Sequence, residues 1–436
     1  MIGLVLTAHA KVVFLLGRQI FEPVRKRREQ INAPPKNITA VIAIVFDNYG
    51  PYLWARVNAV GKILPVLAVE LYGRSAEYAW QRDRAATDVE IATLIADTDR
   101  FHTEAKALER RLREVLDGRA IDAVAIPGWS FPGALVALRW CIDQRIPAIV
   151  MSESTAWDEP RIRIKEWIKR RIVRLFSAGL VGGAPHQDYL AQLGLPDERI
   201  FLGYDVVDNR FFADQAKVAV RRPDLPQKYF LASARFVGKK NLSALLRAFA
   251  LYRQASEHRH AAGECWELVL LGDGEIRPEL LRLRAALGLD TVVHLPGFKQ
   301  YAELPAYYAH ANAFIHASTT EQWGLVVNEA MASGLPVLVS RRCGCARDLV
   351  SEGVNGFTFD PCDSAQIVQL MLKVSATGFP LAKFGVASQR IISDWGPDRF
   401  AAGMVSAVNC ALKVGPRPAG WFDWRLLGVL MRRNNT

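Results

Sequence analysis

The most specific chemical pattern in this sequence is a pair of glutamates on either side of a predicted helix start. Glu321 precedes Gly324, and a helix is expected from about Leu325 to Ser333, with Glu329 about one turn inside it. The unpaired N–H groups at such a helix start, here those of Leu325 and Val326, form an anion site suited to a diphosphate. Glu329 could accept both hydroxyls of a ribose there, while Glu321 would meet a sugar attached to the diphosphate. An ordinary acidic pair at a helix N-terminus is the alternative.

Two cations form the second pattern. Arg235 and Lys240 follow a predicted strand over 229–232, and at its carboxyl edge they could clamp a diphosphate and stabilise its charge as it leaves. A solvated basic turn is the alternative. The segment is not a P-loop, because Lys240 stands where Ser or Thr is required. Gly272-Asp273-Gly274 fits a tight loop beside a nucleotide better than a dinucleotide fingerprint, because the third glycine is absent.

Aliphatic runs that end in polar loops and lead into helical patterns recur through both halves of the chain. The predicted strands are 41–46, 67–72, 121–126 and 148–151 in the first half, and 229–232, 268–271, 291–295, 313–316 and 336–339 in the second. This alternation is typical of open parallel α/β sheets, in which ligands bind beyond the carboxyl ends of the strands. We therefore expect two doubly wound, Rossmann-like domains that face each other across a cleft.

Breaks in this alternation divide the chain into six expected parts. These are an apolar and basic N-terminal segment (1–37), a first domain (38–208), a linker (209–228), a second domain (229–392), a helix that crosses back to the first domain (393–415) and a basic, aromatic tail (416–436). In the N-terminal segment the charges follow the apolar residues, which is the reverse of a secretory signal, so export is not expected. A helix lying on a membrane and a frayed terminus remain open.

Composition and charge narrow the classes of function. Of the 436 residues, 50% are hydrophobic and 23% are charged, which excludes a disordered, collagenous or coiled-coil protein. Six cysteines without a CxxC pair indicate buried thiols in a reducing, cytoplasmic compartment rather than a disulfide framework or zinc ribbon. The net charge of +11 leaves nucleic acid, an anionic membrane surface and a phosphorylated small molecule as possible partners.

The location of the positive charge favours a membrane surface over nucleic acid. Basic residues alternate with aliphatic and aromatic ones over 159–176, which on a helix gives a basic side and an apolar side, and the tail repeats this composition. Such helices suit the inner face of a membrane, although a basic helix face packed on the core is an equal alternative. No nucleic-acid-binding module is recognisable, so a nucleic-acid-binding protein is only a remote alternative.

These residues carry a resemblance to a known family. The stretch from Glu321 to Gly334 resembles the E-x7-E motif of the retaining GT-B glycosyltransferases of family four, the group one glycosyltransferases. Arg235 and Lys240 match that family's G-R-L-x-x-x-K pattern, although Ala234 stands where its glycine is usual. The resemblance is specific over 232–359 and looser in the first half. There, Ser152-Glu153-Ser154 stands after the fifth strand, where family members often have a His near the donor sugar.

The resemblance implies which residues carry the site. The implied catalytic residues are Arg235, Lys240 and Glu321. The implied donor-binding residues are Glu329, Gly324, Leu325, Val326, Gly297, Phe298 and Gly272. The implied residues on the acceptor or donor-sugar side are Gly50, Trp129, Ser130 and Glu153.

The reaction implied by the resemblance is sugar transfer from a nucleoside-diphosphate donor to a hydroxyl group, with retention. The second domain would bind the sugar nucleotide and the first a glycan or lipid-linked acceptor, as in envelope or exopolysaccharide synthesis. The cations and helix-start amides would replace a metal ion, so no cofactor is expected. Asp97-Thr98-Asp99 matches the metal-binding triplet of another glycosyltransferase fold, but such a triplet is expected by chance. An epimerase or a phosphorylase on the same architecture is the alternative.

Overall fold

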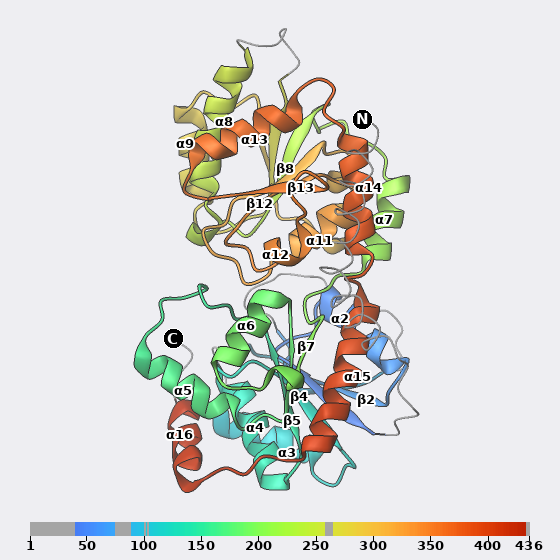
Figure 1. Ribbon diagram of the computed structural model, residues 1–436, viewed down its shortest axis with the longest axis vertical. Helices are drawn as coiled ribbons and strands as arrows, with labels where there is room; N and C mark the ends of the chain where they lie inside the picture. Colours follow the sequence, from blue (N-terminus) through green and yellow to red (C-terminus); the bar gives the residue numbers. More distant parts are fainter. Residues whose placement is uncertain (1–39, 75–88, 100–101, 103, 258–264, 433–436) are drawn as a thin grey trace, which may run out of the picture. The chain divides into compact units, whose positions relative to one another are not determined.

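The computed structural model describes residues 40–74, 89–99, 102, 104–257 and 265–432 (Figure 1). The N-terminal segment 1–37 and the last four residues of the tail lie outside the described part. The described residues from 40 onward form one compact unit. Within the described part, no helix is both long enough and apolar enough to cross a membrane.

The first sheet has seven parallel strands in the order β3-β2-β1-β4-β5-β6-β7. They are β1 (Ile42–Phe46), β2 (Val66–Tyr72), β3 (Glu90–Ile95), β4 (Ala123–Pro127), β5 (Ala148–Ser152), β6 (Ala178–Val181) and β7 (Ile200–Leu202). All five residues of β1 are buried, as expected of a central strand covered on both faces. The strand order reverses between β1 and β4, which is where a doubly wound sheet opens a ligand crevice.

The second sheet has six parallel strands in the order β10-β9-β8-β11-β12-β13. They are β8 (Tyr229–Ser233), β9 (Glu267–Leu271), β10 (Val293–Gly297), β11 (Ala313–His316), β12 (Val337–Ser340) and β13 (Gly356–Phe359). Here the order reverses between β8 and β11. Both patterns of the sequence that carry charge, 235–240 and 321–329, follow these two strands, so the topology brings them to one edge.

Helices connect the strands and cover the sheets (Figure 1). The helices are α2 (Pro51–Gly61), α3 (Ala105–Leu116), α4 (Pro132–Gln144), α5 (Arg163–Val173), α6 (Ala184–Gln192), α7 (Asn209–Val218), α8 (Leu242–Glu257), α9 (Arg277–Ala286), α10 (Leu304–Ala309), α11 (Leu325–Ala332), α12 (Ala346–Leu349), α13 (Ser364–Ser375), α14 (Leu381–Ile392), α15 (Pro397–Val414) and α16 (Trp421–Met431). Short 3₁₀ turns lie at Asp197–Arg199, Gly238–Lys240 and Tyr301–Glu303.

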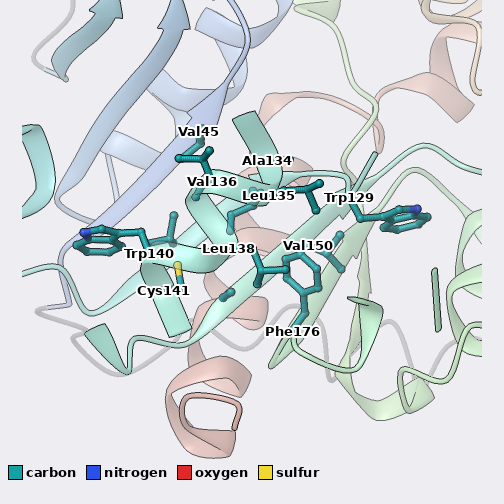
Figure 2. Close-up of a cluster of buried hydrophobic side chains, with 14 of the residues drawn as sticks. Val45, Trp129, Ala134, Leu135, Val136, Leu138, Trp140, Cys141, Val150 and Phe176 are labelled. Atoms are coloured by element: carbon teal, nitrogen blue, oxygen red, sulfur yellow. The ribbon is translucent and has the colours of Figure 1, made fainter. Parts of the chain in front are cut away.

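The core of the first sheet is organised around α4. This helix buries residues on nearly all its sides, and Leu135, Leu138 and Trp140 are each at most 3% exposed. Figure 2 shows them with Val150 of β5 and Phe176 in one apolar cluster. Burial of large apolar side chains contributes about 1.5–3 kcal/mol each, so this cluster fixes the sheet that carries the first half of the site.

The region expected as a linker, 209–228, contains a helix, so that expectation is wrong in its first half. Asp208 caps α7 by accepting a hydrogen bond from the Phe211 amide at 3.1 Å. Phe212 is fully buried in the core of the second sheet, and α7 packs on α10 and α11. Only 219–228 connects without regular structure, because the two phenylalanines give 209–218 an apolar face to bury.

The last two helices pack on the first sheet. α15 lies against α2, β6 and β7, so a helix does return to the first domain from the second. α16 packs on α4, and Leu427 and Met431 belong to the core of the first sheet. The described part of the tail is therefore a docked helix.

Candidate active site

A cavity of about 780 Å³ opens at the carboxyl edges of both sheets. Six of its lining residues come from loops that the sequence singled out: Gly50, Glu153, Arg235, Lys240, Gly272 and Glu321. Other lining residues are Gly324, Leu325, Val326 and Glu329 of the α11 region, and Phe298 and Lys299 after β10. The volume is within the range of sites for small molecules, so this cavity is the candidate active site.

Lys240 and Glu321 form an ion pair in the wall of this cavity. Two hydrogen bonds hold the neighbouring loops together: the Thr319 amide donates to the Lys239 carbonyl at 2.9 Å, and the Asn241 side chain donates to the Ala317 carbonyl at 3.1 Å. The turn after β8 is thus tied to the loop after β11. The side chains are 11% and 10% exposed, so the pair is largely removed from water but open toward the cavity.

Two further side chains meet the Glu321 carboxylate from the protein side. His316 Nε2 lies 3.3 Å from Glu321 Oε2, and Ser318 Oγ lies 3.4 Å from the same atom. Burial by itself raises the pKa of Glu321, but His316 and Lys240 outweigh it and hold the pKa well below its ordinary value. Burial lowers the pKa of His316, yet Cys343 and Glu321 outweigh that effect and raise it to about 9. Glu321 therefore stays ionised at neutral pH between two cationic groups.

Glu329 lies inside the first turns of α11 and is fully buried. The hydroxyl of Tyr52 donates to its Oε1 at 2.6 Å, and the hydroxyl of Tyr308 donates to its Oε2 at 2.7 Å. Burial raises the pKa of Glu329 to about 7, although both tyrosine hydrogen bonds act in the opposite direction. Each carboxylate oxygen already accepts one hydrogen bond, and each has a second lone pair with which to accept another.

Backbone turns shape the remaining wall. Gly324 has φ +100°, a left-handed conformation that favours glycine, and it begins the α11 segment whose residues Leu325 and Val326 line the cavity. A Cβ at Gly272 would lie 1.9 Å from the carbonyl oxygen of Ala234, so only glycine fits between the loops after β8 and β9. Phe298 is 38% exposed and lines the cavity, while its neighbour Gly297 does not.

Two expected residues on the first-domain side lie elsewhere. Trp129 is 6% exposed and belongs to the core of the first sheet rather than to the cavity lining, so its expected place in the cleft is wrong. Ser130 is exposed and is not among the residues that line the cavity. A large aromatic ring at a strand end gains more from burial than from facing a polar cleft. Gly50 and Glu153 do line the cavity.

The sequence did not single out several residues that complete the site. Tyr52 and Tyr308 bind Glu329, Ser318 binds the His316–Glu321 pair, and Arg56 lines the cavity. Tyr52 and Arg56 occupy the helix after β1. The expectation that ligands bind beyond the carboxyl ends of the strands could therefore have found them. No sequence pattern pointed to Tyr308, because it belongs to a short helix whose residues are typical of a hydrophobic core.

The Asp97-Thr98-Asp99 triplet lies after β3 and does not line the cavity. Asp99 Oδ1 instead accepts a hydrogen bond from His102 Nδ1 at 2.8 Å. Across the described ranges, no group of three or more His, Cys, Asp or Glu residues is placed to hold a metal ion.

Residues 213–385 match the family described as "Glycosyl transferases group 1". Among similar sequences is the amylovoran biosynthesis glycosyltransferase AmsK of Erwinia amylovora, which is 26% identical over 279 residues, covering 62% of this chain and 59% of AmsK. The alpha-D-kanosaminyltransferase of Streptomyces kanamyceticus is 28% identical over 200 residues, covering 45% of this chain and 51% of that protein. The chain thus spans just over half the length of these relatives.

The fold is also found in solved structures. Anabaena Alr3699/HepE in complex with UDP superposes with a TM-score of 0.64 at 17% identity, over 85% of this chain and all of that one. The two parallel sheets have the GT-B fold, and residues 213–385 match the family model of the group 1 glycosyltransferases.

Proposed function

We propose that this protein transfers a sugar from a nucleoside-diphosphate donor to a hydroxyl group of an acceptor. The observation that carries the proposal is the convergence of Arg235, the Lys240–Glu321 ion pair and the buried Glu329 on one cavity at the start of α11. Cations and helix-start amides suit a diphosphate, and a buried carboxylate suits the paired hydroxyls of a ribose. The relative AmsK, which is named for amylovoran biosynthesis, supports an exopolysaccharide or lipid-linked glycan as the acceptor.

The proposed reaction retains the anomeric configuration. The bond between the anomeric carbon and the diphosphate oxygen breaks, and the acceptor oxygen forms a bond to the same face of that carbon. The acceptor's proton passes to the departing phosphate oxygen, so no protein base is required. Lys240 and Arg235 stabilise the negative charge on the leaving group, and Glu321 orients the Lys240 ammonium. On this account no metal ion is needed.

Product analysis tests this proposal. The purified protein is incubated with nucleotide-linked hexoses, with and without a lipid-linked saccharide, and the product is examined by mass spectrometry and by the NMR coupling constant of its anomeric proton. The expected product is a glycosylated acceptor with the donor's configuration. An isomerised donor formed without acceptor would identify an epimerase, and a sugar phosphate formed with inorganic phosphate would identify a phosphorylase.

We also propose that α5 and α16 together bind the cytoplasmic surface of an anionic membrane. The rings of Trp167 and Phe422 are 5.8 Å apart, and Asp423 joins the helices by accepting hydrogen bonds from Arg171 and Arg174, each at 2.8 Å at the closest. Trp421 is 75% exposed beside this junction. An exposed aromatic group among arginines is favoured where headgroups meet acyl chains.

Vesicle flotation tests the membrane proposal. The full chain should float with phosphatidylglycerol vesicles and not with phosphatidylcholine vesicles, and Trp421→Ala should weaken this binding several-fold. Val386→Ala is the matched control, because Val386 is 66% exposed on α14, outside the α5–α16 surface. Equal flotation of the wild-type chain with both vesicle types would contradict the proposal, and so would binding to duplex DNA in preference to anionic vesicles.

A further inference from the structure

The carboxylate of Glu329 is held by one hydroxyl group from each domain. Tyr308, on α10 of the second domain, donates to its Oε2 at 2.7 Å. Tyr52, on α2 of the first domain, donates to its Oε1 at 2.6 Å and lines the cavity. Because Glu329 is fully buried, these two donors rather than water orient its carboxylate. The first domain therefore contributes a side chain to the place where the ribose is expected.

Aromatic packing places the ring of Tyr52 against the second domain. The ring meets that of Tyr301 edge to face, with the two ring centres 5.4 Å apart. Tyr301 in turn stacks on Phe211 at 4.6 Å and meets Phe212 edge to face at 5.4 Å. Edge-to-face and offset-stacked rings are the preferred arrangements of aromatic pairs. Phenylalanine at position 52 would keep these ring contacts and remove the hydroxyl group.

The backbone of the first domain holds Tyr52 from the other side. The amides of Leu53 and Trp54 both donate to the Gly50 carbonyl at 3.1 Å, which closes the first turn of α2 around Tyr52. Gly50 and Leu53 also line the cavity. Tyr52 therefore belongs to the same short segment as the first-domain wall of the site, and a force on its hydroxyl group acts on that wall.

Ribose hydroxyls and the two tyrosine hydroxyls favour the same form of Glu329. A hydroxyl group donates more strongly to an ionised carboxylate than to a neutral carboxyl group, because the acceptor is charged. A ribose that donates to the remaining lone pairs would stabilise the ionised form and so strengthen the hydrogen bond from Tyr52. Coupling of this kind is reciprocal. The bond from Tyr52 must therefore strengthen nucleotide binding by the same factor by which the nucleotide strengthens the bond.

We propose that Tyr52 is a positioning residue for the donor, which orients Glu329 toward the ribose from the opposite domain and thereby links nucleotide binding to the docking of α2. The inference rests on the proposed function and goes beyond it, since it gives the first domain, expected to bind the acceptor, a share in the nucleotide site. Tyr52 acts through Glu329, and the nucleotide site is complete only with a side chain from each domain.

The first arm of the test measures ligand binding by calorimetric titration. Tyr52→Phe should weaken the binding of UDP about tenfold, as expected for one hydrogen bond to a charged group, and leave the binding of inorganic diphosphate unchanged, because that ligand has no ribose. A purely structural loss would weaken both ligands alike. Tyr49→Phe is the matched control, because the Tyr49 hydroxyl donates to the Ile44 carbonyl at 2.7 Å on the same segment and does not line the cavity. It should bind both ligands as the wild type does.

The second arm follows the link between the domains by hydrogen exchange and mass spectrometry. Saturating UDP should slow the exchange of the α2 amides in the wild type and in Tyr308→Phe, which loses a hydroxyl group of the second domain only, but not in Tyr52→Phe. Equal protection of α2 in Tyr52→Phe and the wild type would overturn this inference alone. An unchanged affinity of folded Tyr52→Phe for UDP, or an equal loss of affinity for inorganic diphosphate, would do the same. A wild type that binds neither UDP nor another nucleoside diphosphate would overturn the proposed function as well.

Discussion

The burial of Glu329 predicts a pH-dependent loss of stability that a single substitution should remove. Its pKa is raised from 4.5 to about 7, with burial as the main cause, so the folded protein holds this proton more tightly than the unfolded chain. Stability must therefore fall as the pH rises through the interval from about 4.5 to about 7, and the loss is complete above it. Linkage converts this difference into about 2–3 kcal/mol between pH 5 and pH 8.

Glu329→Gln keeps the shape of the side chain and cannot ionise, so it should abolish that part of the pH dependence. The assay is urea unfolding of the wild type and the variant at several pH values, followed by tryptophan fluorescence. From pH 5 to pH 8, the free energy of unfolding of the variant should rise by about 2–3 kcal/mol relative to that of the wild type. Tyr308→Phe should move the wild-type transition to higher pH, because the Tyr308 hydroxyl lowers the pKa of Glu329. If the free energy of unfolding depended on pH in the same way in the wild type and in Glu329→Gln, the reasoning would be refuted.

Three further predictions concern nucleotide binding, packing and metal ions. UDP should bind up to about tenfold more weakly at pH 6 than at pH 8, because the protonated Glu329 loses one acceptor for the ribose hydroxyls. Calorimetric titration of the wild type and of Glu329→Gln with UDP at both pH values checks this. Gly183→Ala places a Cβ 2.3 Å from Asp348 Oδ2, and the displaced carboxylate would lose its hydrogen bond from the Ala184 amide, now 3.0 Å long. Unfolding measurements should therefore show a loss of about 1–3 kcal/mol in stability. Gly428→Ala is the control, because a Cβ at Gly428 meets open space. Excess EDTA should leave the initial rate of sugar transfer unchanged, and a loss restored by Mg²⁺ would contradict metal independence.

Much of the fold follows from local sequence patterns. Long aliphatic runs such as that of β1 are recognisable because a strand buried on both faces needs apolar residues throughout. The strands β3, β6, β7 and β13 were not predicted. β3 is mostly half-exposed, and β6, β7 and β13 have four, three and four residues, so none has a long aliphatic run.

The site was predictable where glycine, charge and a strand end coincide. Lys240, Glu321 and Glu329 met that condition, and the structure brings all three to one cavity. The partners of these residues were not predictable, because a contact such as that of Tyr52 with Glu329 joins positions 277 residues apart. Trp129 illustrates the opposite error, in which a strand-end residue serves the core.

The most direct test of the proposed sugar transfer is product formation by Lys240→Ala, measured by mass spectrometry with the donor and acceptor on which the wild type is active. Lys383→Ala, which removes an exposed lysine on α14, is the matched control. Loss of leaving-group stabilisation should lower kcat about 100-fold or more in Lys240→Ala, with its circular dichroism spectrum unchanged and the control fully active. A folded Lys240→Ala variant that glycosylates the acceptor at the wild-type rate would contradict the assignment of this cavity as the transferase site.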